Sequence, residues 1–431
     1  MQSDAPLTHA RILRFYYPLA LSWLFMSIES PISIALISRL PAPVEHTATF
    51  LVLMGLALWI ESPIIDLLAT STTLCRDRQS FAVISKFVLW LMVWCTVVHA
   101  FIALTPLFDF IAGRLLSVPT AVREHLRTPL ALMIPWSACI GWRRYRQGLL
   151  IRSGRTRAVG FGTAVRMGTM AVVGVCLYLT KRLTGTELAA ISLIASVFAE
   201  ALFAHFVSRQ AVRELPENEG LDLEMGKLLR FHLPLTATTM LTLATIPIVS
   251  AAVAKSQGPV LQMAAWQVTS TLLWMHRTVV FALPEVIITL YRDQASIAKL
   301  RSFCLLVGAA ATGFMGLLWL TRLDVAFFLG VLGAAPQSAE TAHFALGLCI
   351  LFPFIGALQS YARGMLTVHH LTMPRLFAVA AGMAFLLFGL WVGLRLDWPG
   401  VALAAFAMTI GLIAEWVVLT AANVRSLAAS S

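Results

Sequence analysis

The sequence predicts an all-α membrane protein, with twelve transmembrane helices in two pseudo-symmetric six-helix bundles. The chain of 431 residues is 59% hydrophobic and only 12% charged, whereas soluble domains carry about 25% charged residues. Apolar runs recur along the whole chain, and each is long enough to cross a hydrocarbon core of about 30 Å. Short motifs of the first half also return in the second half at a nearly constant separation.

The apolar runs define the expected helices in order. Backbone groups in lipid must be hydrogen-bonded within their own segment, so each run is expected to be helical. The twelve runs cover residues 15–38, 47–70, 87–105, 130–151, 159–179, 188–207, 233–254, 260–290, 303–320, 342–366, 376–394 and 401–422. The outer connectors 107–128 and 322–341 each hold an apolar stretch, a proline and a polar helical run. We expect them to form short interfacial helices.

The repeat has a period of about 216 residues. The segment LRFYYPL at 13–19 returns as LRFHLPL at 229–235, and Gly148 returns as Gly364. Six spans separate the copies, so both halves have the same orientation in the membrane, as in parallel transporter repeats. We therefore expect an N-terminal lobe at 1–212, a polar cytoplasmic linker at 213–227 and a C-terminal lobe at 228–431.

The net charge of +11 orients the chain and does not indicate nucleic-acid binding. Lys and Arg gather in segments on one side of the expected membrane, including 71–86, 143–157 and 209–230. By the positive-inside rule both termini are expected in the cytoplasm, with the chain in the cell inner (plasma) membrane. The six cysteines show neither paired nor metal-type spacing, so we expect free thiols and no metal site. We expect a monomer in contact with membrane lipid.

Several short motifs resemble a known transporter group. They are Leu7-Thr8-His9, Leu13-Arg14-Phe15 with Pro18-Leu19, Pro63-x-x-Asp66, Arg76-Asp77-Arg78, Phe352-Pro353 and Gly364. With the twelve duplicated spans, they make the chain similar to the multidrug/oligosaccharidyl-lipid/polysaccharide (MOP) exporter superfamily, which includes MATE drug exporters, and most similar to its progressive-ankylosis (ANK) family. The resemblance implies a V-shaped pair of bundles around a central cavity, and efflux of anions such as pyrophosphate, nucleotides or citrate.

Charged side chains within the spans are the candidate functional groups, because each costs about 2.5–3.5 kcal/mol to insert. The fourth span carries Arg143, Arg144, Arg146 and Gln147. Guanidinium groups match carboxylate and phosphate oxygens, so these residues, with His276 and Arg277 of the eighth span, are predicted to bind an anionic substrate. The alternatives are that the arginines reach the cytoplasmic surface or pair with Glu61, and that Arg277 pairs with Glu415 or Glu285.

Acidic residues of the first two spans are candidates for coupling to protons or sodium. Glu29 precedes Pro31 without an obvious partner, and Glu61 and Asp66 flank Pro63. A proline frees a backbone carbonyl that can join a cation or proton site. The alternative for Asp66 is a cap or a pair with Arg76.

Two further groups are predicted to be structural. Glu200 and Glu415 occupy equivalent positions in the two halves, and Arg166 lies at a similar depth, so we expect them to form ion pairs within each bundle. Equivalent pairs at cytoplasmic helix ends are expected to form gate ion pairs or plain anchors. These are Arg76 with Asp77, and Arg292 with Asp293.

The sequence contains no hydrolase, zinc-protease, dinucleotide or P-loop motif, so we expect neither an enzyme nor a cofactor. Transport would then be driven by gradients. Our first hypothesis is a secondary exporter of organic or phosphorylated anions that works by alternating access. The alternatives are a MATE-type proton- or sodium-coupled antiporter of cationic drugs and a flippase for a lipid-linked precursor. A membrane receptor or scaffold is disfavoured, because it would gain nothing from so many buried charges.

Overall fold

A computed structural model describes residues 7–217, 223–369, 371 and 373–430, and these residues form helices and connections without a strand. The predicted all-α fold class is confirmed. Of the expected linker 213–227, residues 218–222 lie outside the described part of the chain. The first half folds as α2 (Glu29–Ile37), α3 (Pro43–Ile65), α4 (Leu67–Leu74), α5 (Arg78–Leu104), α6 (Leu107–Asp109), η1 (Phe110–Leu115), α7 (Thr120–Arg123), α8 (Arg127–Leu132), α9 (Trp136–Arg152), α10 (Thr156–Thr180) and α11 (Gly185–Arg213), after α1 (His9–Ser27).

The second half repeats this order of helices. It consists of α12 (Met225–Ala254), α13 (Pro259–Phe281), α14 (Leu283–Leu290), α15 (Gln294–Leu320), α16 (Leu323–Ala326), η2 (Phe327–Val331), α17 (Pro336–Leu348), α18 (Phe352–Val368), α19 (Met373–Arg395) and α20 (Gly400–Ser430). The two outer connectors are short helices, as expected, and each contains one π-helical turn.

Ten helical segments within the described residues are long and apolar enough to cross a membrane, and the pair α17 and α18, bent by 47°, makes an eleventh. The expected span at 130–151 is not among them. Its helix is broken between α8 and α9 at residues 133–135, and α9 carries the arginine cluster. This segment therefore consists of two shorter helices, and the second of them carries several arginines. It differs in both respects from a continuous apolar span.

The chain divides into two compact units that do not follow the halves of the sequence. Unit 2 comprises Ile32–Lys255 with Pro259–Ala264, and unit 1 comprises the residues up to Pro31, residues 256–258 and those from Ala265 on. In unit 1, α1 packs against α14 and α15 of the second half; in unit 2, α12 packs against α3 and α4 of the first half. The division into lobes 1–212 and 228–431 describes the duplication of the sequence. That these two lobes are the bodies that move during transport stays a prediction.

The repeated LRFxxPL motif explains this exchange of first helices. The Tyr16 hydroxyl donates to the Val279 carbonyl at 2.8 Å. His232 lies 216 residues after Tyr16, and its Nε2 is 2.9 Å from the Pro63 carbonyl, which lies 216 residues before that of Val279. Within unit 1, α1 of the first half thus bonds to α13 of the second half. Within unit 2, α12 of the second half bonds to α3 of the first half.

Helix breaks follow each of these contacts. Pro63 lacks an N–H, and the Ser62 hydroxyl donates at 2.7 Å to the Trp59 carbonyl that the proline leaves free. The helix then breaks at Asp66, between α3 and α4. An equivalent break at Ala282 separates α13 from α14, and a break at Ile28 separates α1 from α2.

The repeated glycine of α9 permits close helix packing within unit 2. A Cβ at Gly148 would lie 1.7 Å from Ser71 Oγ and 2.9 Å from the Leu68 carbonyl of α4. A Cβ at the equivalent Gly364 would lie 2.9 Å from the Ile287 side chain of α14. Glycine therefore lets α9 pack closely against α4 in the first half, and lets α18 pack closely against α14 in the second half.

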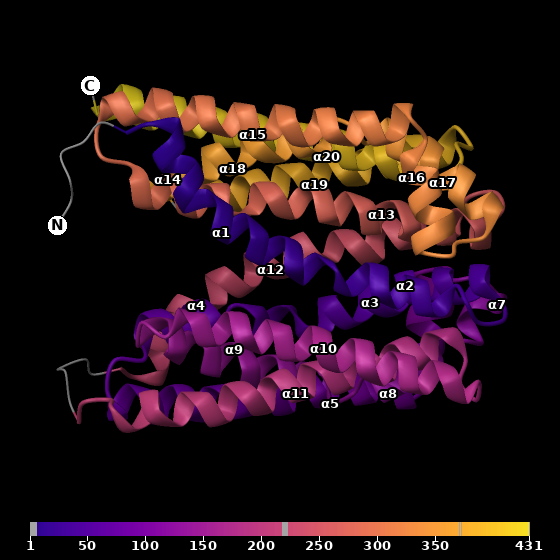
Figure 1. Cartoon of the computed structure of the whole chain (residues 1–431), viewed down its shortest axis with the longest axis horizontal. Helices are drawn as coiled ribbons and strands as arrows, with labels where there is room; N and C mark the ends of the chain where they lie inside the picture. Colours follow the sequence, from indigo (N-terminus) through magenta and orange to yellow (C-terminus); the bar gives the residue numbers. More distant parts are fainter. Residues whose placement is uncertain (1–6, 218–222, 370, 372, 431) are drawn as a thin grey trace. The chain divides into compact units, whose positions relative to one another are not determined.

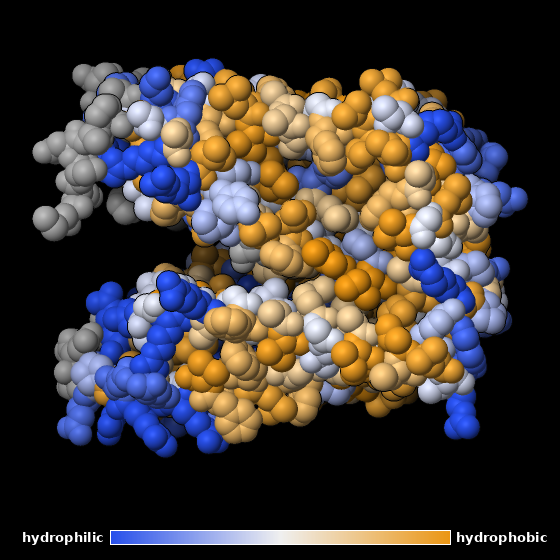
Figure 2. Space-filling model, viewed as in Figure 1, coloured by the Kyte–Doolittle hydropathy of each residue, from blue (hydrophilic) through white to orange (hydrophobic). Residues whose placement is uncertain are grey.

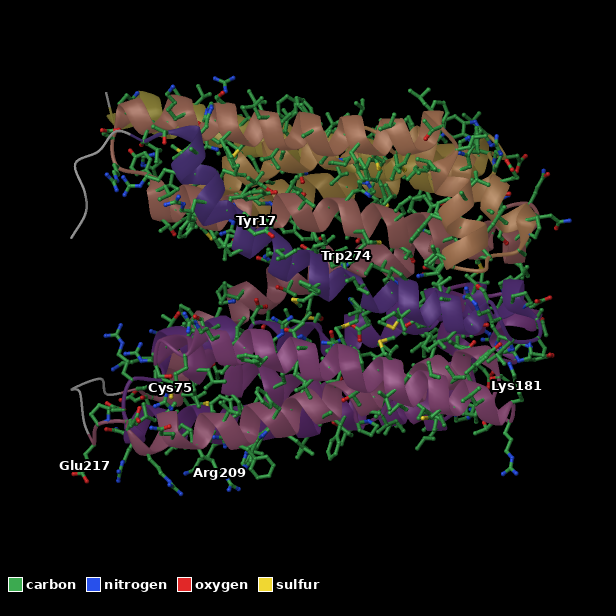
Figure 3. All side chains as sticks on the ribbon, in the orientation of Figure 1. Tyr17, Cys75, Lys181, Arg209, Glu217 and Trp274 are labelled. Carbon is green, nitrogen blue, oxygen red and sulfur yellow. The ribbon has the colours of Figure 1, made fainter. Side chains whose placement is uncertain are left out.

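Each unit has an apolar flank and polar helix ends (Figures 1 and 2). Large exposed side chains such as Trp90, Trp94 and Phe206 lie on the flanks of α5 and α11. In unit 2, Arg209 and Glu217 lie toward one end of the bundle and Lys181 toward the other (Figure 3). This distribution fits a multi-pass membrane protein, in which lipid covers the apolar flank.

Candidate substrate and coupling sites

Glu200 on α11 of unit 2 carries a charge that is fully buried. Arg143 of α9 donates through Nη1 to Glu200 Oε2 at 2.9 Å, and Gln147, one turn along, donates to Oε1 at 3.0 Å. Arg166 of α10 adds a third contact at 3.6 Å. Arg143 and Gln147, predicted to bind substrate, thus engage a carboxylate of their own unit, which is the geometry of a structural ion pair. Arg166 and Glu200 come together as expected for a structural pair.

Arg144 occupies a different face of α9 from Arg143. Its Nε atom is buried without a hydrogen-bond partner, and none of the ion pairs found among the described residues includes it. It lies within electrostatic range of Arg143, Arg166, Glu61 and Glu200. Glu61 of α3 is also buried, and its Oε2 lacks a hydrogen-bond partner. The Asp66 carboxyl also interacts electrostatically with Arg144, so the cluster holds three guanidinium groups against three carboxyl groups.

Arg146 is separated from this cluster by aromatic rings. Its guanidinium lies 4.5 Å from the Trp142 ring centroid, 5.3 Å from that of Tyr145 and 5.8 Å from that of Phe81. A cation held over aromatic faces is stabilised by their negative quadrupole. Arg146 lies three residues after Arg143, a spacing that places both on one side of a helix, but the structure does not bring Arg146 to Glu200.

Unit 1 contains the counterpart of the Glu200 cluster, with two residues exchanged. Glu415 of α20 accepts from Arg363 and, at 3.4 Å, from Gln359, both on α18. Residues 143 and 147 are Arg and Gln, whereas residues 359 and 363, each 216 positions later, are Gln and Arg. Sequence reasoning missed Arg363 as the partner of Glu415, although the exchanged Arg and Gln at matching positions could have indicated it.

Arg277 of α13 takes part in none of the ion pairs found among the described residues of unit 1. Its Nε is buried without a hydrogen-bond partner, and its guanidinium lies 5.8 Å from the Phe281 ring centroid. It interacts electrostatically with Arg363 and Glu415. Arg375 of α19 also lies within electrostatic range of these two groups. This cluster therefore holds three guanidinium groups against one carboxyl group.

His276 contacts its own helix and α15. Its Nδ1 lies 2.9 Å from the Leu272 carbonyl of its own helix, and its ring stacks on Phe314 at 5.6 Å. His276 was predicted to bind an anion together with Arg277. The contacts that the structure gives it are packing contacts with its own helix and with Phe314.

The predicted coupling acids lie at or beside helix breaks. Glu29 begins α2 after the break at Ile28, and Asp66 stands between α3 and α4. The Asp66 carboxyl has a buried Oδ2 without a hydrogen-bond partner. Glu61 lies with the arginines described above. The structure thus separates Asp66 and Glu61 in unit 2 from Glu29, which belongs to unit 1.

Asp77 and Asp293, predicted as gate residues with Arg76 and Arg292, cap helices. Each accepts a hydrogen bond at 2.8 Å from the backbone N–H of a serine three residues later, at the start of α5 and α15. The Asp-x-x-Ser spacing is a capping signal that the sequence analysis did not use. A gate role for these residues stays a prediction.

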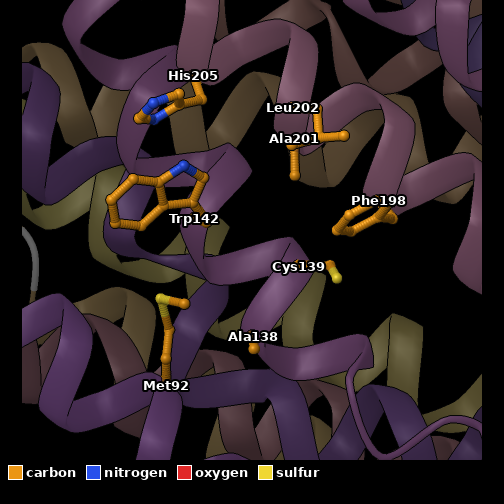
Figure 4. Close-up of a pocket in the computed structure, with 8 residues that line it drawn as sticks. All are labelled: Met92, Ala138, Cys139, Trp142, Phe198, Ala201, Leu202 and His205. Atoms are coloured by element: carbon orange, nitrogen blue, oxygen red, sulfur yellow. The ribbon is translucent and has the colours of Figure 1, made fainter.

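A groove of about 360 Å³ opens between α5, α9 and α11 of unit 2 (Figure 4). Apolar side chains such as Met92, Cys139 and Phe198 line it, with Trp142 and His205 along one wall. None of the ion-paired residues contributes to this lining. Within the described residues, no group of three His, Cys, Asp or Glu side chains could hold a metal ion.

Solved structures with the same fold are transporters of the MOP superfamily. An inward-facing multidrug-resistance MATE transporter matches with a TM-score of 0.68 at 14% identity, over 93% of this chain and 95% of that chain. A MOP-superfamily transporter from Pyrococcus furiosus matches with a TM-score of 0.68 at 12% identity, over 98% and 96%. The lipid II flippase MurJ matches with a TM-score of 0.67 at 11% identity, over 93% and 86%.

The sequence matches no family model and no curated protein. At 11–14% identity, the structural matches establish the fold. This chain is therefore a multi-pass membrane protein with the fold of MOP-superfamily transporters. Its resemblance to the ANK family stays a prediction.

Proposed function

We propose that this protein is a secondary transporter of the cell inner membrane that exports organic or phosphorylated anions by alternating access. The observation that supports this is that Arg144 and Arg277 each have a buried Nε atom without a hydrogen-bond partner, and that Arg277 lies in a cluster of three guanidinium groups against one carboxyl group. Leaving a buried charge without compensation is costly. An anion that reaches Arg144 or Arg277 would supply an acceptor for its Nε atom.

Arg144 and Arg277 are the proposed substrate-binding residues. Their buried Nε atoms have no protein acceptor, and guanidinium groups bind carboxylate or phosphate oxygens through two parallel hydrogen bonds. Arg143 and Gln147 pass to a structural role, because Glu200 already occupies them. The likeness to the ANK family, with its links to pyrophosphate and citrate, supports the same substrate class. A MOP-superfamily transporter with the same fold is itself described as having a binding pocket of reversed polarity.

Uptake by proteoliposomes tests the proposal. Purified protein would be reconstituted, and uptake of labelled citrate or pyrophosphate measured for wild type, Arg144→Ala and Arg277→Ala. A charged hydrogen bond contributes about 1.5–3 kcal/mol, so each variant should bind the anion roughly 10- to 150-fold more weakly. Arg182→Gln removes the same charge from an exposed loop position and should leave uptake unchanged. Wild-type uptake of both anions in each arginine variant would refute the assignment.

A second candidate is a proton- or sodium-coupled exporter of cationic drugs. It is favoured by the buried oxygens of Glu61 and Asp66 that lack hydrogen-bond partners, because a cation could bind there. Efflux of ethidium from the same proteoliposomes, lost in Glu61→Gln and retained in Arg144→Ala, would favour this candidate over anion export. Transport of a lipid-linked precursor, the function named for MurJ, would appear instead as lipid movement without uptake of either solute.

A further inference from the structure

His232 on α12 lies 1% exposed at the place where α3 ends and α4 begins, inside unit 2. Its Nε2 is 2.9 Å from the Pro63 carbonyl oxygen and its Nδ1 is 2.8 Å from Thr70 Oγ1. The edge of Phe87 contacts the ring at a centroid distance of 5.0 Å. Both ring nitrogens are thus bonded, so the ring is held in one position.

The hydrogen bonds around His232 accommodate both of its protonation states. The Pro63 carbonyl can only accept, so Nε2 carries a hydrogen. The Thr70 hydroxyl also lies 3.0 Å from the Asp66 carbonyl, which likewise can only accept. If the Thr70 hydroxyl donates to Nδ1, the ring is neutral. If the hydroxyl donates instead to the backbone carbonyl of Asp66, Nδ1 donates to the hydroxyl oxygen and the ring is cationic. A proton can therefore bind while a single hydroxyl hydrogen rotates.

The elements packed against α12 carry several ionisable residues. These elements are α3, α4 and α5. The end of α3 carries the half-buried Asp66, whose carboxyl interacts with Thr239 of α12 and with Arg144, and one turn earlier the same helix carries Glu61. The sequence of α4 contains no ionisable residue, and α5 presents Phe87 beside the exposed Lys86. The other ionisable residues of α5 are Arg78, Cys95 and His99, and those of the described part of α12 are Lys227, Arg230 and His232 itself.

The duplicated position in unit 1 provides an internal comparison. Tyr16 makes the same bond to a helix-break carbonyl, but a phenol titrates only near pH 10. An imidazole ordinarily changes charge near pH 6.5 and is the usual side chain for proton exchange at physiological pH. The two halves thus use one contact with two chemistries, and only the contact in unit 2 can take up a proton in the working range.

We propose that His232 is a proton-binding site of the transport cycle, a role that rests on the proposed transport function. Proton uptake turns the Thr70 hydroxyl toward Asp66, so it changes the hydrogen bonding at the break between α3 and α4. The imidazolium is then compensated by the Asp66 carboxylate, which Arg144 also attracts. An anion on Arg144 would weaken that competition, so proton and anion should each favour the binding of the other.

Nuclear magnetic resonance of histidine-labelled protein in lipid nanodiscs tests proton binding without a substrate. His232→Tyr is the matched variant, because it places the Tyr16 side chain at the equivalent contact and removes the titratable ring. One ring ¹⁵N signal should be absent from the variant. In the wild type, that signal should pass from the neutral to the imidazolium pattern between pH 8 and pH 5. A signal that stays neutral, or stays charged, over this range would overturn the proposal.

A transport measurement tests the role of this proton in the cycle. Proteoliposomes containing a pH-sensitive dye would report proton movement on addition of citrate or pyrophosphate. In His232→Tyr, exchange of labelled for unlabelled anion should persist, while proton movement should fall at least tenfold. Proton movement equal to the wild type would overturn the proposal. His232→Gln, whose amide can donate to Pro63, serves the same purpose if the tyrosine does not fold. If the wild type transports neither anion, the proposed function fails, and the nuclear magnetic resonance titration still decides whether His232 binds a proton.

Discussion

Replacing Glu200 by Gln should destabilise the protein more than any other single loss of a carboxylate. Glu200 is fully buried, and the side chains of Arg143 and Arg166 are 5% and 10% exposed, with contacts at 2.9 and 3.6 Å. The substitution keeps the shape but leaves two buried guanidinium groups facing a neutral amide. Removing one partner of a buried ion pair costs about 3–5 kcal/mol. For a unit of this size, that corresponds to a fall in Tm of roughly 6–20 °C.

Glu415→Gln is the matched comparison, because it removes the equivalent carboxylate from unit 1. Its partner Arg363 has a side chain that is 31% exposed, so water compensates the remaining charge, and the expected cost is nearer the ~1 kcal/mol of an exposed pair. Glu217→Gln, at a pair 4.0 Å apart with a 91% exposed carboxylate, should leave Tm unchanged. Tm would be read from thiol-reactive dye fluorescence in detergent.

A double-mutant cycle separates the ion pair from other effects of the substitution. Arg143→Gln reproduces the residue found at the equivalent position 359. In the Glu200→Gln background it removes one orphaned charge, so it should recover part of the lost stability, with a coupling energy above about 1 kcal/mol. Equal Tm values for Glu200→Gln and Glu415→Gln, or an additive double variant, would refute the reasoning.

Three further outcomes are expected. Gly148→Ala, whose Cβ would lie 1.7 Å from Ser71 Oγ, should destabilise the protein by about 1–3 kcal/mol. Gly168→Ala, which has open space in α10, should be neutral or stabilising. A lower Tm for Gly168→Ala than for Gly148→Ala would contradict the packing of α9 on α4. Tyr16→Phe should cost about 0.5–1.5 kcal/mol by removing the bond to Val279, and a wild-type Tm would show that this bond stabilises nothing. Burial raises the pKa of the Cys75 thiol to about 12, so at pH 8 only about one thiol in 10⁴ is ionised. Mass spectrometry should therefore find maleimide on the exposed Cys176 and on Cys75 only after unfolding, and fast labelling of native Cys75 would contradict its burial.

The fold could be predicted because membrane insertion imposes strong local rules. Apolar runs in lipid have to become helices, and the repeat of LRFxxPL and Gly148 indicates the duplication from the sequence alone. At residues 130–151 the apolar run did not reveal that the helix is broken at 133–135, between α8 and α9. The sequence also could not predict that α1 and α12 are exchanged between the units, because the partner of a side chain such as Tyr16 depends on long-range packing.

Sequence reasoning brought Arg166 to Glu200, as the structure does, but missed the partners of Arg143 and Glu415. Arg166 and Glu200 were expected at a similar depth, counted at about 1.5 Å per residue along their helices, and the structure places Arg143 beside the same carboxylate. Spacing along one helix could not show which face meets a carboxylate, so Arg143 was grouped with Arg146 although only the former reaches Glu200. Arg363 was missed because the duplication exchanged Arg and Gln between the two positions that flank the carboxylate.

Electrical recording on a solid-supported membrane tests the central claim most directly. Proteoliposomes are exposed to a sudden step of citrate, pyrophosphate or a permanent organic cation, and the sign of the transient current reports the charge that moves. We expect a current of the anionic sign with citrate or pyrophosphate, and its loss in Arg144→Ala and Arg277→Ala. A current only with the organic cation, retained in both arginine variants, would contradict the claim that buried guanidinium groups select the substrate.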